Sequence, residues 1–119
     1  MTKSALHIAI KRVYDPPEPA DGKRVLVDRL WPRGLSKERA HIDLWLKDLA
    51  PSNELRKWYG HDPEKFEEFR RRYEAELSNK QDALEQLRET ARHEPVTLVF
   101  SAHDAEHSNA AVLLDVLKR

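Results

Sequence analysis

Hydrophobic residues recur along this chain with two different spacings, which separate predicted strands from predicted helices. Residues 5–14 alternate between apolar and polar positions and are rich in β-branched side chains, a pattern typical of a strand. A short apolar run predicts a second strand over 24–30. A third is predicted over 95–102, where Val96–Phe100 is almost continuously apolar, as expected of a strand covered on both faces at the centre of a sheet.

The spacing becomes helical between the second and third predicted strands and again near the end of the chain. Asp62 and Pro63 supply an N-cap and a first-turn proline for the most regular of these segments, and Gly60 ends the segment before it. The periodicity predicts helices over residues 42–49, 52–58, 62–77, 84–91 and 105–117.

This order of elements predicts an α/β fold for a single domain spanning residues 1–119. We expect a small three-layer sandwich in which helices flank a mainly parallel, three-stranded sheet. The connection between the first two strands, Asp15–Gly22, contains three prolines and a glycine. It is shorter than the dozen or so residues that a parallel crossover usually needs, so an antiparallel pair is the alternative.

Charge and cysteine content narrow the classes of function. The 21 basic and 21 acidic residues cancel, so no global field draws the protein to nucleic acid or to a membrane surface, and any anion site must be local. The absence of cysteine excludes disulfides, thiolate nucleophiles and cysteine-ligated zinc. The start of the chain lacks the apolar stretch of a signal peptide or membrane span, so we expect a cytoplasmic protein that does not engage a membrane.

Polar residues follow each predicted strand at its carboxyl end, where open α/β sheets bind ligands. Residues 27–37, VDRLWPRGLSK, combine cations, a tryptophan and a Pro-Arg-Gly turn, which are the ingredients of a phosphate or carboxylate clamp. Alternatively, Asp28 pairs with one arginine, Trp31 packs the loop onto the core and Lys37 is solvated. If the strands are parallel, we expect one ligand-binding cleft lined by Arg12, Tyr14, Arg29, Trp31, Arg33, Lys37, Ser101, His103 and Asn109.

Three residues are candidates for proton transfer in this cleft: Asp28, His61 and Asp104. Each also has a structural interpretation, because His61 lies at a helix entry and Asp104, like Ser108, is suited to cap the last helix. The spacing His103-x-x-x-His107 is typical of two metal ligands on one helical turn, but no third ligand accompanies it, so we predict no metal site. No cofactor is assigned.

Five segments carry a resemblance that covers the chain almost from end to end. They are RVYDPP, DGKRVLVDRLWPRGLSKE, LAPSNELRKWYGHDP, FRRRYEAEL and TLVFSAHDAEHSNAAVLL. Together they resemble the bacterial domain of unknown function 488 family (DUF488), in its short YeaO-like branch. The resemblance implies a small α/β fold but no activity. In the longer branch the N-terminal elements look like strand, helix, strand, so Asp15–Gly22 is interpreted as a shrunken crossover between parallel strands.

The family pattern also falls on Arg12, Tyr14, Asp28, Arg29, Trp31, Arg33, Lys37, Arg56, Trp58, His61, Asp104 and Asn109. This chain departs from the family pattern at His103, where relatives commonly carry a Lys or Arg. Two functions remain open. In the first, the cleft binds a small anionic ligand, with phosphate as one candidate group, and the protein acts either as a binder or as an enzyme. In the second, a non-catalytic module binds nucleic acid or a protein through exposed Trp31, Trp45 or Trp58.

Overall fold

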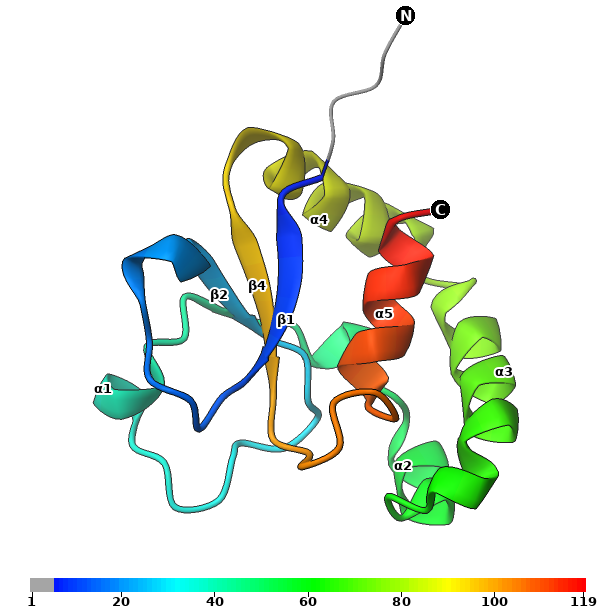
Figure 1. Ribbon diagram of the computed structural model, residues 1–119. Helices are drawn as coiled ribbons and strands as arrows, with labels where there is room; N and C mark the ends of the chain where they lie inside the picture. The colour runs from blue at the N-terminus through cyan, green and yellow to red at the C-terminus, as the bar shows by residue number, and fades with distance from the viewer. Residues whose placement is uncertain (1–5) are drawn as a thin grey trace, which may run out of the picture.

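Four parallel strands form one sheet in the computed structural model, which describes residues 6–119. In sheet order they are β1 (Ile8–Arg12), β4 (Val96–Phe100), β2 (Lys23–Leu26) and β3 (Leu44–Trp45). All three pairings are parallel, and β4 lies between β1 and β2 (Figure 1). The predicted α/β class, the parallel direction and the interior place of the third predicted strand are therefore confirmed, although the sheet has a fourth strand. Residue 5, where the first strand was expected to begin, lies outside the described part.

The crossover from β1 to β2 passes beside β4 without an α-helix. It contains only a short 3₁₀ turn, Pro19–Asp21, followed by Gly22 at φ 62°. The first residue of β2, Lys23, then donates its backbone N–H to the carbonyl of Pro95 at 2.9 Å. This contact begins the β2–β4 ladder directly after the turn.

Five α-helices and irregular segments cover the two faces of the sheet. In Figure 1, α1 lies on one side of the sheet, and α3, α4 and α5 gather on the other. None of these helices is long and apolar enough to cross a bilayer within residues 6–119. The bounds are α1 (Lys37–Ala40), α2 (Asn53–Tyr59), α3 (Phe66–Leu77), α4 (Gln81–His93) and α5 (Asn109–Leu117).

The strands divide the core into two clusters because successive side chains point to opposite faces. Val96, Leu98 and Phe100 of β4 pack into the larger cluster with α2 to α5. Val99 packs into a smaller cluster with Ala40 of α1, against which Trp31, Leu35, Ile42 and Trp45 are placed. The second face of the sheet is thus covered mainly by loops, and these loops also build the wall of the cleft described below.

The predicted helix over 42–49 is wrong. This segment forms β3 and a 3₁₀ turn, Lys47–Leu49. Its apolar residues do not share one face, because Ile42 and Trp45 pack into the smaller cluster whereas Leu46 and Leu49 pack into the larger one. The chain passes around the edge of the sheet here, and the helical spacing is coincidental.

Two further differences from the prediction concern α5 and α1. The last helix begins at Asn109 rather than at residue 105, and Ser108 caps it by accepting the backbone N–H of Ala111 at 3.1 Å. The short helix α1 was not predicted. Ser36 caps it by accepting the N–H of Arg39, and this turns the chain away from the sheet edge directly after the Pro-Arg-Gly segment.

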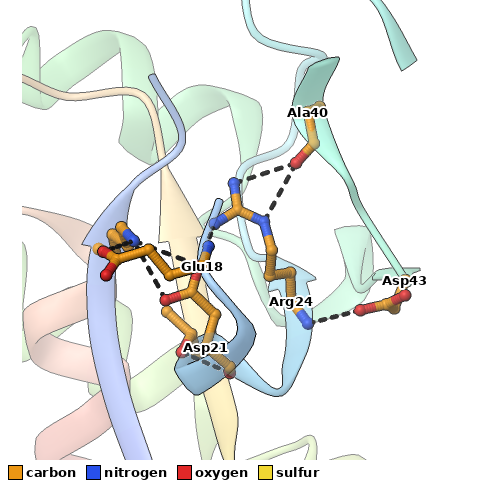
Figure 2. A network of polar contacts seen from close by, with 7 residues as sticks. Glu18, Asp21, Arg24, Ala40 and Asp43 are labelled. Carbon is orange, nitrogen blue, oxygen red and sulfur yellow. Dashed lines mark hydrogen bonds and ion pairs between the residues drawn. The ribbon is translucent and has the colours of Figure 1, made fainter. Parts of the chain in front are cut away.

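A buried ionic network replaces hydrophobic packing under the crossover (Figure 2). Arg24, only 3% exposed, donates to the Asp21 carboxylate at 2.8 Å and twice to the carbonyl of Ala40. Lys11 reaches the same carboxylate at 3.1 Å. Burial alone would raise the pKa of Asp21, but hydrogen bonds from the backbone of Glu18 and from both cations outweigh it and lower that pKa.

Candidate functional site

A cleft of about 690 Å³ opens at the carboxyl edge of the sheet, a volume within the usual range for small-molecule sites. Parallel strands bring their carboxyl ends to one edge, so segments far apart in sequence meet there. The cleft is lined by Arg12 at the end of β1 and Tyr14 beyond it, by residues 28–33 after β2, by residues 101–103 after β4, by Ser108 and Asn109 at the start of α5, and by Pro51, Arg56, Tyr59, His61 and Phe69.

All of the predicted site residues except Lys37 and Asp104 line this cleft. Lys37 belongs to α1, which Ser36 directs away, and it borders a separate depression beside Arg24 and Asp43. Asp104 is exposed in the turn before α5. The alternative interpretation of Lys37 as a solvated side chain is therefore the better one.

Asp28 forms the polar floor of the cleft and is joined to two other elements. Its Oδ2 accepts hydrogen bonds from the backbone N–H and hydroxyl of Ser101, at 2.9 and 2.8 Å. Its Oδ1 accepts from the side-chain amide of Asn109 at 3.3 Å, and that amide also donates to the carbonyl of Val27 at 2.9 Å. Asp28 thus ties the end of β2 to the end of β4 and the start of α5, and it pairs with no arginine.

Burial raises the pKa of Asp28, and the hydrogen bonds from Ser101 and Asn109 only partly oppose this. A raised folded-state pKa means that ionisation of Asp28 costs folding free energy. The neutral acid adds to the free energy of unfolding. This added stability is complete below the unfolded-state pKa and is lost as pH rises through the folded-state pKa.

The Asp28→Asn variant should therefore keep nearly all of its stability at pH 7. It retains a carbonyl oxygen for Ser101 and removes a buried charge, so we expect the free energy of unfolding to change by less than about 1 kcal/mol. Asp28→Ala leaves the donors of Ser101 and Asn109 without an acceptor and should cost about 1–3 kcal/mol. Urea unfolding measures both. Between pH 7 and pH 4 the wild type should gain stability relative to Asp28→Asn, and a difference that does not vary with pH would contradict the assignment.

The cationic side chains of the cleft are four arginines, and Asp28 is the one acidic residue that accompanies them in its lining. Arg12 donates to the carbonyl of Ala102 at 2.9 Å, and Arg29 to that of Pro51 at 2.9 Å. Within residues 6–119, no carboxylate forms an ion pair with Arg12, Arg29, Arg33 or Arg56. Arg12, Arg29 and Arg56 hydrogen-bond to neutral groups, and the four charges have no acidic partner in this part of the chain, so the cleft concentrates positive potential.

Arg56 and Tyr59 were not predicted as site residues, although both lie on α2 and line the cleft. The Nε atom of Arg56 is buried without a hydrogen-bond partner in the described part of the chain. Tyr59 donates its hydroxyl to the carbonyl of His107 at 2.6 Å and stacks on Phe69. Burial, followed by the nearby carboxylates, raises the pKa of Tyr59 to about 12. The only signal in the sequence for Arg56 was that the family pattern falls on it.

Of the three candidate acid–base groups, Asp28 and His61 line the cleft and Asp104 lies outside it. The carboxylate of Asp104 accepts a hydrogen bond from Nδ1 of His107 at 2.6 Å, and this hydrogen bond lowers the pKa of Asp104. Asp104 is therefore held ionised outside the cleft. It does not cap α5, and it is not placed to exchange a proton with a ligand in the cleft. His61 is exposed after Gly60, at φ 57°. His103 and His107 precede α5, so they do not share a helical turn, and residues 6–119 contain no cluster of three side chains suited to hold a metal.

The three tryptophans are largely occupied by internal contacts. Trp31 packs edge-on against Trp45 with ring centroids 5.5 Å apart, and both rest on the smaller core cluster. The ring of Trp58 is flanked by Lys65 and Arg72, with their charged groups 5.1 and 4.4 Å from its centroid. All three are half-buried, and none stands open as a stacking platform.

The fold and the cleft define a small α/β protein with an arginine-lined site at the carboxyl edge of a parallel sheet. Residues 7–119 match the family model described as "Inactive DUF488-N3 subclade", and the chain belongs to this DUF488 family. It is 46% identical to the uncharacterized protein Rv3073c of Mycobacterium tuberculosis over 110 residues, 92% of each chain. It is 42% identical to the uncharacterized protein YeaO of Escherichia coli, over 95% of this chain and 98% of that one. No solved structure gave a significant match. The resemblance to the YeaO-like branch is confirmed.

Proposed function

We propose that this protein binds a small phosphorylated organic anion in the arginine-lined cleft and holds it without converting it. The observation that carries the proposal is the set of four arginines that surround a 690 Å³ cavity without an acidic partner of their own. Arginine presents a planar set of donors that matches the oxygens of phosphate. The positive end of α5, which begins at Asn109 in the cleft, adds to the same field.

Binding is favoured over catalysis by the state of two of the three acid–base candidates. The carboxylate of Asp28 already accepts three hydrogen bonds, and Asp104 is paired with His107 outside the cleft. A general base needs a free position within hydrogen-bond reach of its substrate. The description of the matching subclade as inactive agrees with a protein that retains a ligand site without turnover.

A concave site for a small molecule is also favoured over an open surface for nucleic acid or protein. A module of the second kind would present basic and aromatic side chains over a broad face. Here the arginines line one cavity, and Trp31, Trp45 and Trp58 pack against other side chains.

Thermal melting against a ligand panel tests the proposal. The panel contains inorganic phosphate, sugar phosphates, nucleotides, carboxylic acids and short single- and double-stranded nucleic acids. A ligand at about one hundred times its Kd adds about 2.7 kcal/mol to the free energy of unfolding, so one class of phosphorylated compound should raise the melting temperature by several degrees.

The matched variants are Arg33→Ala and Arg71→Ala. Arg33 is exposed in the cleft wall, and the side chain of Arg71, 79% exposed on α3, lies outside the cleft. Arg33→Ala should melt like the wild type without ligand but bind the ligand about tenfold more weakly, whereas Arg71→Ala should bind normally. Absence of a shift with every small anion, or a shift only with nucleic acid that fades as salt rises, would refute the proposal.

A further inference from the structure

The mouth of the cleft carries exposed apolar side chains in addition to its positive charge. Among the large hydrophobic residues described by the structure, only Tyr14, Leu30 and Leu44 are exposed. Tyr14 and Leu30, 41% and 56% exposed, both line the cleft, while Leu44 lies on the edge strand β3. Exposed apolar side chains that border a binding cavity mark where the apolar part of a ligand makes contact.

Besides Leu30, the mouth of the cleft is formed by two planar groups, the ring of Tyr14 and the guanidinium of Arg12. The guanidinium of Arg12 lies over the ring of Tyr14, 5.3 Å from its centroid, and the Tyr14 hydroxyl donates to the backbone carbonyl of Arg33 at 2.9 Å. Aromatic rings and guanidinium planes are the surfaces on which nucleobases stack.

The second part of the cleft is cationic and belongs to the segment that leads into α2. Arg29 is fixed on this segment through the carbonyls of Ala50 and Pro51, at 3.4 and 2.9 Å. Arg56 follows on α2 and also lines the cleft. Its guanidinium is a second planar set of donors for phosphate oxygens on this side of the cleft.

We infer that the ligand is a nucleoside monophosphate, with its phosphate against Arg29 and Arg56 and its base against Tyr14 and Leu30. This inference rests on the proposed phosphate-binding function and names the organic part of the ligand. The 690 Å³ cavity is far larger than a phosphate ion requires, and it admits a base and a ribose as well. His103 and Ser101 also line the cleft and offer polar contacts for the sugar.

Isothermal titration calorimetry separates the contributions of the two ends. The probes are the four common ribonucleoside 5′-monophosphates, the corresponding nucleosides, ribose 5-phosphate and inorganic phosphate. At least one nucleotide should bind tenfold or more tightly than ribose 5-phosphate, which lacks the base, and than its own nucleoside, which lacks the phosphate.

Variants at Leu30 and Arg56 test which part of the nucleotide each end of the cleft contacts. Leu30→Ser should weaken nucleotide binding severalfold and leave ribose 5-phosphate binding unchanged, whereas the control Leu44→Ser should change neither. Arg56→Gln should weaken the nucleotide and ribose 5-phosphate by the same factor, about tenfold. If Arg56→Gln fails to fold, as judged by circular dichroism, Arg56→Lys replaces it, because it keeps the charge but loses the planar donor set and should still weaken both ligands.

The possible failures are distinguishable. If ribose 5-phosphate binds as tightly as every nucleotide, or Leu30→Ser weakens both equally, the nucleotide assignment is wrong and the phosphate site stands. If none of the phosphates binds, the proposed function itself is wrong. A 5′-phosphorylated oligonucleotide that binds more tightly than the free nucleotides would overturn the inference in favour of a strand end.

Discussion

Replacing Asp21 by alanine should lower the free energy of unfolding by about 3–5 kcal/mol, the usual cost of removing one partner from a buried ion pair. The reason is the position of Arg24, which is 3% exposed and donates to Asp21 at 2.8 Å. Without that carboxylate the guanidinium keeps only the carbonyl of Ala40 as a partner, and its charge stays buried without compensation.

Urea unfolding at pH 7 measures this loss, and Glu18→Ala is the matched control. Glu18 also pairs with Lys11, at 2.8 Å, but its side chain is 66% exposed, so its loss should cost no more than about 1 kcal/mol. The pKa of Asp21 is lowered in the fold, so its contribution is present above the ordinary value of 3.8 and is lost as pH falls through the folded-state pKa. The cost of Asp21→Ala should therefore shrink in acid, and a cost that stays constant or stays below that of Glu18→Ala would contradict the role assigned to the network.

Gly22→Ala should be destabilising by about 2–5 kcal/mol, because it combines a strained backbone with a direct steric clash. Gly22 has a φ of 62°, which favours glycine. A Cβ atom there would lie 2.3 Å from the carbonyl oxygen of Pro95. That oxygen accepts the first hydrogen bond of the β2–β4 ladder, from Lys23, so relief of the clash would separate β2 from the central strand.

Gly34→Ala isolates the backbone part of this effect. Gly34 has a φ of 76°, and nothing lies within 4 Å of a Cβ atom built on it. Its replacement should therefore cost only about 1–2 kcal/mol. Chemical unfolding of the two variants gives the comparison, and equal losses would show that the close approach to Pro95 is not a constraint.

The main architecture was predictable because its signals are local and strong. The apolar run Val96–Phe100 could only be a covered strand, and Asp62, Pro63 and Gly60 mark helix ends by their own backbone chemistry. The segment 42–49 was misinterpreted because Ile42 and Trp45 pack into the smaller core cluster and Leu46 and Leu49 into the larger one, which only the tertiary structure reveals. A strand as short as Leu44–Trp45 has no periodicity of its own.

The site was predictable to the extent that the strand ends determine it. Arg12, Asp28 and Ser101 meet in one cleft because parallel strands align their carboxyl ends, and the sequence predicted this. The partners of each side chain were not predictable. Asp28 is held by Ser101 and Asn109 rather than by an arginine, and Arg56 reaches the cleft from a helix whose orientation depends on packing across the whole domain.

The order of the strands has a consequence for how the chain is made. The central strand β4 is the last to be synthesised, and its two partners, β1 and β2, come from near the start of the chain. In the described sheet β1 pairs only with β4, whereas β2 pairs with β4 and β3, so a growing polypeptide holds β1 unpaired and β2 paired on one side only until Phe100 has been added. Contacts this distant in sequence slow folding, because the long intervening segment must first be closed into a loop. Folding of the sheet and assembly of the arginine cleft are therefore one late event, completed only after β4 has been synthesised.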